Sequence, residues 1–357
     1  MLPNNAVVDL YCGAGGLAHG FFLEGFSVTA GIDIDVECKY AFEKNNGTAR
    51  FVEKDIHNLT SKDLEALFLD GSIKILVGCA PCQPFSPYAR TNKNKDEEKW
   101  KLLNEFERLI REVKPEIVSM ENVHDLIFSD VYTSFYEALI ELGYHVNVCD
   151  SVYTPDYGVP QTRTRLVLLA SRLGNIEMIP PTCNPGEYKK VSDFITGLPE
   201  IKAGETDKKD SLHRASRLSK KNLERIQASK PGGTWNDWPN HLIAECHKRE
   251  NGKTYKNVYG RMSWNEPAPT MTTQCNAYGT GRFGHPDQDR AISLREAALL
   301  QTFPIDYKFV PEGEPYHISI VSRMIGNAVP VELGRAIAKS IKSHLLSLQQ
   351  QLNQEIG

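Results

Sequence analysis

The sequence has no long hydrophobic run, which excludes a helical membrane protein. Its longest apolar stretch, at residues 166–170, is far shorter than the roughly 18 residues that a membrane-spanning helix needs, and it suits a buried strand. The first residues carry neither a charged segment nor a cleavage site, so nothing marks the chain for secretion. We therefore expect a cytoplasmic protein.

Cysteine is sparse, and the 8 cysteines of the 357 residues lack the spacing of a disulfide framework. Without a secretion signal, reduced thiols are the expected state. Cys79 and Cys82 form a C-x-x-C pair, which is typical of redox centres and of half a zinc site. No second pair accompanies it, and Pro84 and Pro87 leave little room for the helix that a redox pair needs. We expect no metal, and a packing role for Cys79.

The chain also lacks an excess of positive charge, because its formal net charge is −4. This argues against a wholly basic coat for nucleic acid. Residues 186–260, however, hold 15 lysines and arginines against 10 acidic residues, a net of +5 that leaves −9 for the remainder. A basic segment on an acidic body is compatible with one DNA-facing surface, and a solvated lysine-rich face explains it equally well.

What the first half does have is an alternation of short β-rich runs with amphipathic stretches. The expected strands lie at 6–11, 26–32, 74–78, 116–121, 145–150 and 165–170, with a further short strand before residue 55. The expected helices lie at 36–45, 61–68, 100–113 and 129–142. This alternation predicts an α/β fold, a mostly parallel sheet with helices on both faces. Ligands of such sheets bind beyond the carboxyl ends of the strands.

The regular alternation stops near residue 180. The following segment is rich in Pro, Gly, Asn and Lys, and we expect Trp235 and Trp238 to form a small core within it. A regular pattern resumes at 292–301, and apolar residues recur at helical spacing after Pro330. We therefore expect a first domain at 1–175 that 291–357 completes, and a smaller irregular domain at 176–290.

A glycine-rich turn follows the first expected strand. Gly13, Gly15 and Gly16 permit a tight strand-to-helix turn and let backbone N–H groups approach a ligand closely. Their G-x-G-G spacing fits the nicotinamide fingerprint poorly, and a purely structural turn is the alternative. Asp33, at the end of the second strand, is placed to accept hydrogen bonds from ribose hydroxyls.

Two further aspartates have a simpler interpretation beside the functional one. We expect Asp35 to cap the helix that follows it. Asp55 follows the short third strand, where it could contact an adenine amino group or cap a turn.

Candidate chemistry follows the later strands. In GCAPCQPFS, residues 78–86, Cys82 sits in a proline-bounded loop after a strand, a suitable place for a nucleophile. Glu121 ends the next strand, and a buried carboxylate is costly unless it has a partner or chemistry to perform. Gln161, Arg163 and Arg165 alternate onto one face of an extended segment, and the arginine pair indicates an anion site.

Six blocks together resemble the DNA (cytosine-5) methyltransferase family. In order along the chain they are DLYCGAGG, GCAPCQPFS, MENV, QTRTR, LREAALLQTFP and GNAVP. The resemblance spans nearly the whole chain except roughly residues 176–282, and six ordered blocks are far more specific than any one. It implies an S-adenosylmethionine-dependent, Rossmann-like methyltransferase fold with a DNA-recognition domain at 176–290.

The resemblance also implies the residues that bind S-adenosyl-L-methionine. They would be Asp9, Tyr11, Gly13, Gly15, Gly16, Leu17, Asp33, Ile34, Asp55, Ile56, Leu102, Asn327 and Val329. Two of them depart from the family pattern, in which phenylalanine is usual at the place of Tyr11 and a large aromatic residue is frequent at that of Ile34. These changes could alter how the adenine packs without abolishing its binding.

By the same resemblance, Cys82 would attack carbon 6 of a flipped-out cytosine, so that carbon 5 can take the methyl group. Glu121 would supply a proton or donor at ring nitrogen 3. Arg165, with Arg163, would hold the base's carbonyl or the phosphate and help to keep Cys82 ionised.

The implied partner is duplex DNA, with no membrane and no metal, and we expect a monomer of bacterial or phage type. Base edges would be read by some of Arg249, Lys253, Tyr255 and Arg261. Three alternatives stay open: a tRNA cytosine-5 methyltransferase, a catalytically inactive DNA-binding relative, and a nicotinamide-dependent oxidoreductase.

Overall fold

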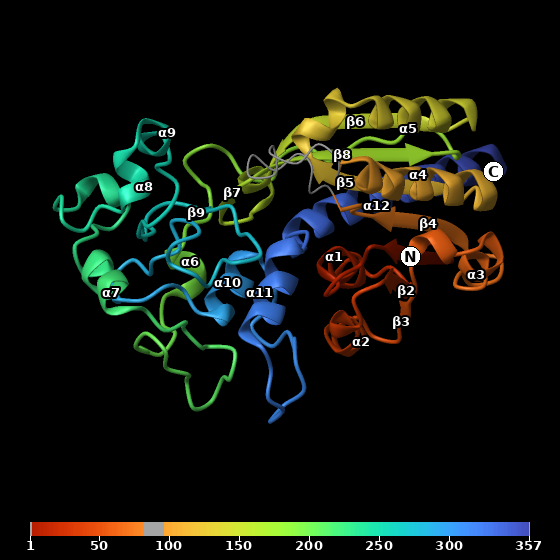
Figure 1. The fold of residues 1–357 in the computed structure, drawn as a ribbon. Helices are drawn as coiled ribbons and strands as arrows, with labels where there is room; N and C mark the ends of the chain where they lie inside the picture. The colour runs from red at the N-terminus through yellow and green to blue at the C-terminus, as the bar shows by residue number, and fades with distance from the viewer. Residues whose placement is uncertain (1, 82–95, 357) are drawn as a thin grey trace.

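A seven-stranded sheet forms the centre of the larger part of the molecule (Figure 1). The computed structural model describes residues 2–81 and 96–356. Across the sheet the strands follow the order β3 (Arg50–Glu53), β2 (Val28–Asp33), β1 (Asn5–Leu10), β4 (Ile73–Gly78), β5 (Ile117–Val123), β8 (Thr164–Ser171) and β6 (His145–Tyr153). The first five are parallel, whereas β8 runs antiparallel to both of its neighbours. The predicted mostly parallel sheet is therefore confirmed.

Two layers of helices explain why the central strands read as continuous apolar runs. All six residues of β1 are buried, because Val7 packs into the core on one face and Val8 into the core on the other. One face is covered by α3 (Ser61–Glu65), α4 (Asp96–Val113) and α5 (Asp130–Glu141). The opposite face is covered by α1 (Gly16–Leu23), α2 (Lys39–Asn45) and α12 (Val331–Ile356).

The direction of β8 matters for function. The parallel strands β1, β2, β4 and β5 bring their carboxyl ends to one edge of the sheet, where Asp33 and Glu121 lie. Because β8 is antiparallel, its first residues meet the same edge, and Arg165 pairs with Val123 at the end of β5. Acidic side chains from the parallel strands and a basic side chain from the antiparallel strand therefore lie at the same edge of the sheet.

The segment after β8 consists of short elements around a separate small core. These elements are α6 (Ser192–Ile195), α7 (Lys220–Gln227), α8 (Glu245–Lys248), α9 (Glu250–Lys253) and β9 (Ala268–Pro269), which pairs with β7 (Gln161–Thr162). Trp235 and Trp238 are buried with Ile226 and Tyr278, so the small core predicted from the two tryptophans is confirmed. Val191 and Met262 belong instead to the larger core beside the sheet. The division into two domains stays a prediction.

The C-terminal part of the chain returns to the sheet. After α10 (Leu294–Leu300) and the unpredicted helix α11 (Ile318–Asn327), α12 packs directly against α1. Their backbones nearly touch, since a Cβ atom on Gly20 would lie 2.5 Å from the carbonyl carbon of Gly334. In the described part of the chain, no helix is long and apolar enough to cross a membrane.

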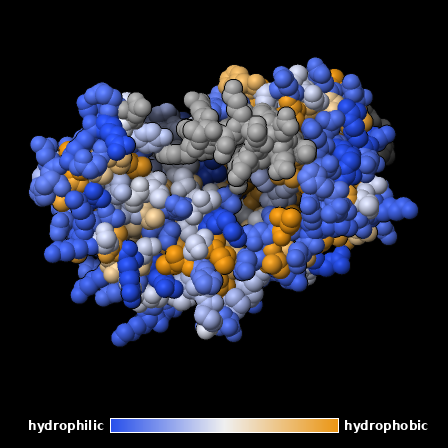
Figure 2. Space-filling view, in the orientation of Figure 1, coloured by the Kyte–Doolittle hydropathy of each residue, from blue (hydrophilic) through white to orange (hydrophobic). Residues whose placement is uncertain are grey.

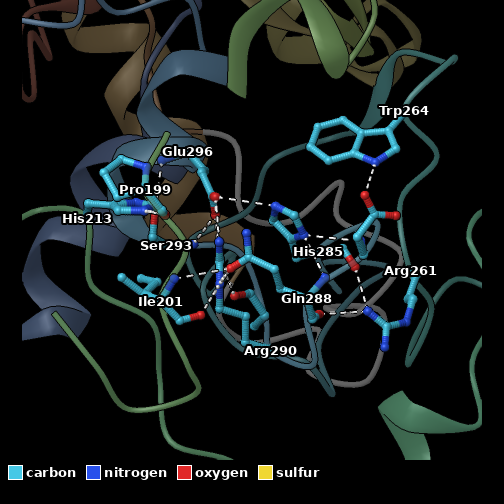
Figure 3. A network of polar contacts seen from close by, with 12 residues as sticks. Pro199, Ile201, His213, Arg261, Trp264, His285, Gln288, Arg290, Ser293 and Glu296 are labelled. Atoms are coloured by element: carbon cyan, nitrogen blue, oxygen red, sulfur yellow. Dashed lines mark hydrogen bonds and ion pairs between the residues drawn. The ribbon is translucent and has the colours of Figure 1, made fainter. Parts of the chain in front are cut away.

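A buried polar network joins the start of α10 to the preceding turn (Figure 3). Arg290 is fully buried and makes two hydrogen bonds to Glu296, of 2.7 and 2.8 Å. His285 Nδ1 accepts from the backbone N–H groups of Asp287 and Gln288, at 3.2 and 3.0 Å. A buried ion pair of this kind is tolerated because both charges are hydrogen-bonded, and it fixes the turn rather than adding net stability.

Arg261 belongs to this network, which corrects its interpretation as a base-reading residue. Its guanidinium is buried and donates to the carbonyl oxygens of Ile226, Ser229, His285 and Gln288 and to the carboxylate of Asp289. Every nitrogen of the group is engaged within the protein. Arg261 therefore holds the fold together and is not presented to a base at the surface.

His285 makes the folded state sensitive to acid. Burial, opposed by Glu296 and assisted by Arg290, lowers its pKa from 6.5 to about 4. As pH falls below 6.5, the unfolded chain takes up a proton that the folded chain refuses, so stability is lost down to about pH 4. We expect His285→Gln to remove about 2 kcal/mol of the stability difference between pH 6.5 and 5.

Thermal or denaturant unfolding at a series of pH values measures this effect. The exposed His241, changed in the same way, serves as the control and should leave the slope intact. A His285→Gln variant that loses stability on acidification as steeply as the unmodified protein would contradict the assignment.

Candidate active site

A cavity of about 700 Å³ opens at the edge of the sheet where the carboxyl ends of the parallel strands meet. Figure 2 shows the surface hollowed between the sheet-bearing part and the part with short elements. Eleven residues singled out from the sequence line it together: Asp9, Tyr11, Gly13, Gly16, Leu17, Asp33, Glu121, Arg163, Arg165, Asn327 and Val329. Residues distant in the sequence thus form one site.

Five other predicted residues do not line the cavity. Gly15 is the residue before α1, with a positive φ of 91°. Asp55 caps a short 3-10 turn by accepting from the N–H of His57, and Ile56 is buried. The side chain of Leu102 packs against the core, and its carbonyl accepts from the Tyr11 hydroxyl at 2.6 Å. Ile34 is 67% exposed. Their roles toward a cofactor stay predictions, and Cys82 lies outside the described residues.

The glycine-rich turn leaves room at its start and none at its end. A Cβ atom on Gly13 would meet nothing within 4 Å, whereas one on Gly16 would lie 2.3 Å from the carbonyl oxygen of Val329. Gly16 therefore lets the C-terminal segment close against the turn. Tyr11 holds a left-handed backbone with φ 59°, and this strain in a non-glycine residue is typical of functional sites.

Two carboxyl groups, one buried and one half-buried, face this turn. Asp9 is 1% exposed, and its Oδ2 has no hydrogen-bond partner. Burial, together with the nearby charge of Asp33, raises the pKa of Asp9 well above its usual value. Asp33 accepts from the N–H of Gly13 at 2.8 Å and from that of Asp35 at 2.9 Å, and burial raises its pKa as well. This end of the cavity favours cations and hydroxyl donors.

Asp35 carries out the capping role predicted for it and a second one. Its side chain accepts from the N–H of Glu37 at the start of a 3-10 turn. It also forms an ion pair of 2.6 Å with Arg323 of α11. Since Asp35 and Arg323 both line the cavity, the pair connects two of its walls.

The other end of the cavity is built around Glu121, whose side chain is 1% exposed. Cys79 Sγ donates to Glu121 Oε2 at 2.8 Å. Arg165 Nε lies 3.1 Å from Oε1 as an ion pair, although its N–H does not point along a hydrogen bond, so Oε1 accepts none. Cys79 also packs against the larger core as predicted, but its thiol belongs to the site.

Arg163 places a buried guanidinium with unpaired N–H donors at the same end of the cavity. It is buried, and its Nε and Nη1 have no hydrogen-bond partner. Burial, with the neighbouring charge of Arg165, lowers its pKa to about 9, so it remains protonated at neutral pH. A buried donor left without a partner is costly, and a carbonyl or phosphate oxygen in the cavity would satisfy it.

Gln161 does not line the cavity with the arginines, although the sequence predicted all three on one face. Its side chain is fully buried and donates to Gln301 Oε1 at 2.9 Å while accepting from the N–H of Met271 at 2.9 Å. It connects β7, the end of α10 and the segment after β9. Its role is therefore structural.

One wall of the cavity was not predicted. Thr270, Met271, Thr272 and Thr273 line it, and they come from the irregular segment in which no motif pointed to them. This wall lies close to α11, since a Cβ atom on Gly326 would be 2.2 Å from the carbonyl carbon of Thr272. Among the residues that the structure describes, no three His, Cys, Asp or Glu side chains are grouped to hold a metal, and the expectation of a metal-free site stays a prediction.

Comparison with known proteins gives consistent matches along the whole chain. Residues 5–343 match the family described as C-5 cytosine-specific DNA methylase. The chain is 58% identical to the Type II methylase M.HgiDII of Herpetosiphon aurantiacus over 97% of both chains. It is 32% identical to the Type II methyltransferase M.PspPI of a Psychrobacter species, covering 94% of this chain and 78% of the relative.

Solved structures agree in fold. A putative DNA modification methyltransferase encoded within an Escherichia coli prophage superimposes with a TM-score of 0.73 at 23% identity, covering 96% of this chain and 99% of that one. The Dnmt2 methyltransferase of S. pombe superimposes with a TM-score of 0.65 at 18% identity, covering 96% of this chain and 99% of that one. At these identities the likeness concerns the fold alone.

Proposed function

Because the chain belongs to the C-5 cytosine-specific DNA methylase family and is a DNA (cytosine-5)-methyltransferase, we propose that it methylates one specific duplex sequence, with S-adenosylmethionine as donor and Cys82 as nucleophile. The family resemblance of the six sequence blocks is confirmed, and with it the nicotinamide alternative is excluded. The single observation that carries the proposal is the cavity that joins the glycine-rich turn to Glu121, Arg163 and Arg165.

The residues at the glycine-rich end fit S-adenosylmethionine. This molecule carries a sulfonium, an ammonium group and ribose hydroxyls, and when bound it supplies an electrophilic methyl group. Asp9 offers an unpaired buried oxygen for a cation, and Asp33 offers acceptors for the ribose. The space at Gly13 admits a ligand against the backbone, and Asn327 and Val329 close the opposite wall.

The residues at the other end fit a cytosine that has left the base stack. Cys82 forms a bond to carbon 6 and pushes electron density onto carbon 5, which then takes the methyl group. Glu121 holds a proton at ring nitrogen 3 and so limits the negative charge that builds on the ring. Arg163 and Arg165 face the carbonyl oxygen or phosphate, and their charge favours the thiolate form of Cys82. Loss of the carbon 5 proton and release of Cys82 then restore aromaticity.

Residues 176–290 would supply the recognition surface. Arg249 and Lys253 are exposed, although Lys253 also pairs with Glu250. With Arg261 excluded, Arg249 and Lys253 are the basic side chains left among the predicted base-reading candidates. The Type II methylases among the relatives favour a place in a restriction-modification system for this chain as well.

The purified protein, supplied with methyl-labelled S-adenosylmethionine, should label duplex DNA and leave folded tRNA unlabelled. Sequencing of 5-methylcytosine in DNA from cells that express the chain then identifies the target sequence. Label in tRNA and none in DNA would replace the proposal by the tRNA alternative. Absence of label in both would favour an inactive DNA-binding protein.

A further inference from the structure

The thiol of Cys79 stands beside the carboxylate of Glu121 as a consequence of strand register. Parallel strands β4 and β5 pair Gly78 with Met120, so Cys79, the first residue after β4, lies beside Glu121 of β5. Both side chains line the cavity. The contact therefore follows from the pairing of the last residue of β4 with β5.

Glu121 has few partners for a buried carboxylate. Within the described part of the chain, the Cys79 thiol makes the only hydrogen bond to it, of 2.8 Å to Oε2. Arg165 attracts Oε1 across 3.1 Å without a hydrogen bond. The carboxylate is thus held between a neutral donor on one oxygen and a cation on the other, and the balance of these two contacts decides how it is oriented.

We propose that Cys79 is a positioning residue for the methyl transfer: its thiol holds Glu121 in the orientation that serves the cytosine ring and keeps the carboxylate from turning fully onto Arg165. This inference rests on the proposed role of Glu121. A thiol suits the task because S–H is a weak donor. The thiol satisfies the carboxylate before the base binds, and its hydrogen bond can break at a small cost in free energy when the base arrives.

Two substitutions of Cys79, one with a stronger donor and one with no donor, should change the pH–rate profile in different ways. In Cys79→Ser the hydroxyl keeps the carboxylate in place but stabilises its charged form, so Glu121 loses its proton at lower pH. The basic limb of the single-turnover pH–rate profile should move down by about half a pH unit, with the rate on the acidic side unchanged. In Cys79→Ala the carboxylate turns onto Arg165, and the rate should fall about tenfold at every pH.

The exposed Cys246, changed to serine, is the matched control and should leave the profile as it is. Unfolding temperatures show whether both Cys79 variants are folded, and covalent trapping on DNA containing 5-fluorocytosine shows whether Cys82 still attacks. Profiles of both Cys79 variants that coincide with the unmodified enzyme would overturn the inference. So would an equal, pH-independent loss in both, because a merely structural role predicts that result.

Failure of the inference and failure of the proposed function give different results. If the unmodified protein transfers no label to DNA, the proposed function is wrong. If it transfers label and the basic limb persists in Glu121→Gln, that limb does not report Glu121, and the assignment of Glu121 fails. If both of those tests succeed and Cys79→Ser leaves the limb in place, only the role of Cys79 is overturned.

Discussion

Cys82→Ser is expected to lower methyl transfer to duplex DNA by at least roughly 10³-fold, because the reaction needs an anion that can add to carbon 6. A cysteine is partly ionised near neutral pH even without help. A serine hydroxyl stays protonated under the same conditions. Binding of DNA and of S-adenosylhomocysteine should change little, since the substitution replaces a single sulfur atom by oxygen.

The measurement combines single-turnover rates with covalent trapping. DNA with 5-fluorocytosine at the target position cannot release the enzyme, because fluorine replaces the proton that must leave. The unmodified protein should form a stable adduct with it, and Cys82→Ser should form none. A serine variant that methylates DNA at a rate near that of the unmodified enzyme would refute the mechanism outright.

Glu121→Gln should lower the single-turnover rate by about 10²- to 10⁴-fold, which is the usual contribution of a positioned acid. The amide keeps the size of the side chain and can still accept from Cys79, but it cannot pass a proton to ring nitrogen 3. Adduct formation with 5-fluorocytosine DNA should slow with it, because charge on the ring is less stabilised as Cys82 adds.

Glu116→Gln is the matched control for this change. Glu116 precedes the opposite end of the same strand β5, where it accepts from the N–H of Lys74. The same loss of a carboxylate there should leave the rate within about twofold, since surface changes remote from a site have small effects. Equal losses in the two variants would assign the effect to the strand and not to the acid.

The sequence was sufficient to predict which residues of the site lie at the ends of strands. Buried strands read as apolar runs, and the polar residues directly after them, such as Asp33 and Glu121, could be placed at one edge without a structure. The direction of β8 could not be deduced, because an apolar run such as LVLLA reads the same for either direction. That direction is what brings Arg165 to Glu121.

The remaining errors have a common physical cause, which is burial by distant segments. Arg261 and Gln161 look solvent-facing in the sequence because their types usually are. Their partners lie up to 140 residues away, at Gln301 in the case of Gln161. The wall at Thr270–Thr273 was missed for the same reason: nothing local marks it, and α11 makes it a wall.

The close approach of Gly16 to Val329 ties the start of the chain to its far end. During synthesis, the glycine-rich turn emerges early, but its opposite wall exists only after α11 and the first turns of α12 have left the ribosome. A product that stops before residue 318 would keep all the strands of the sheet and lack the cavity wall formed by Arg323, Met324, Gly326, Asn327, Ala328 and Val329. We expect such a fragment to bind cofactor weakly, so that incomplete translation yields inactive protein.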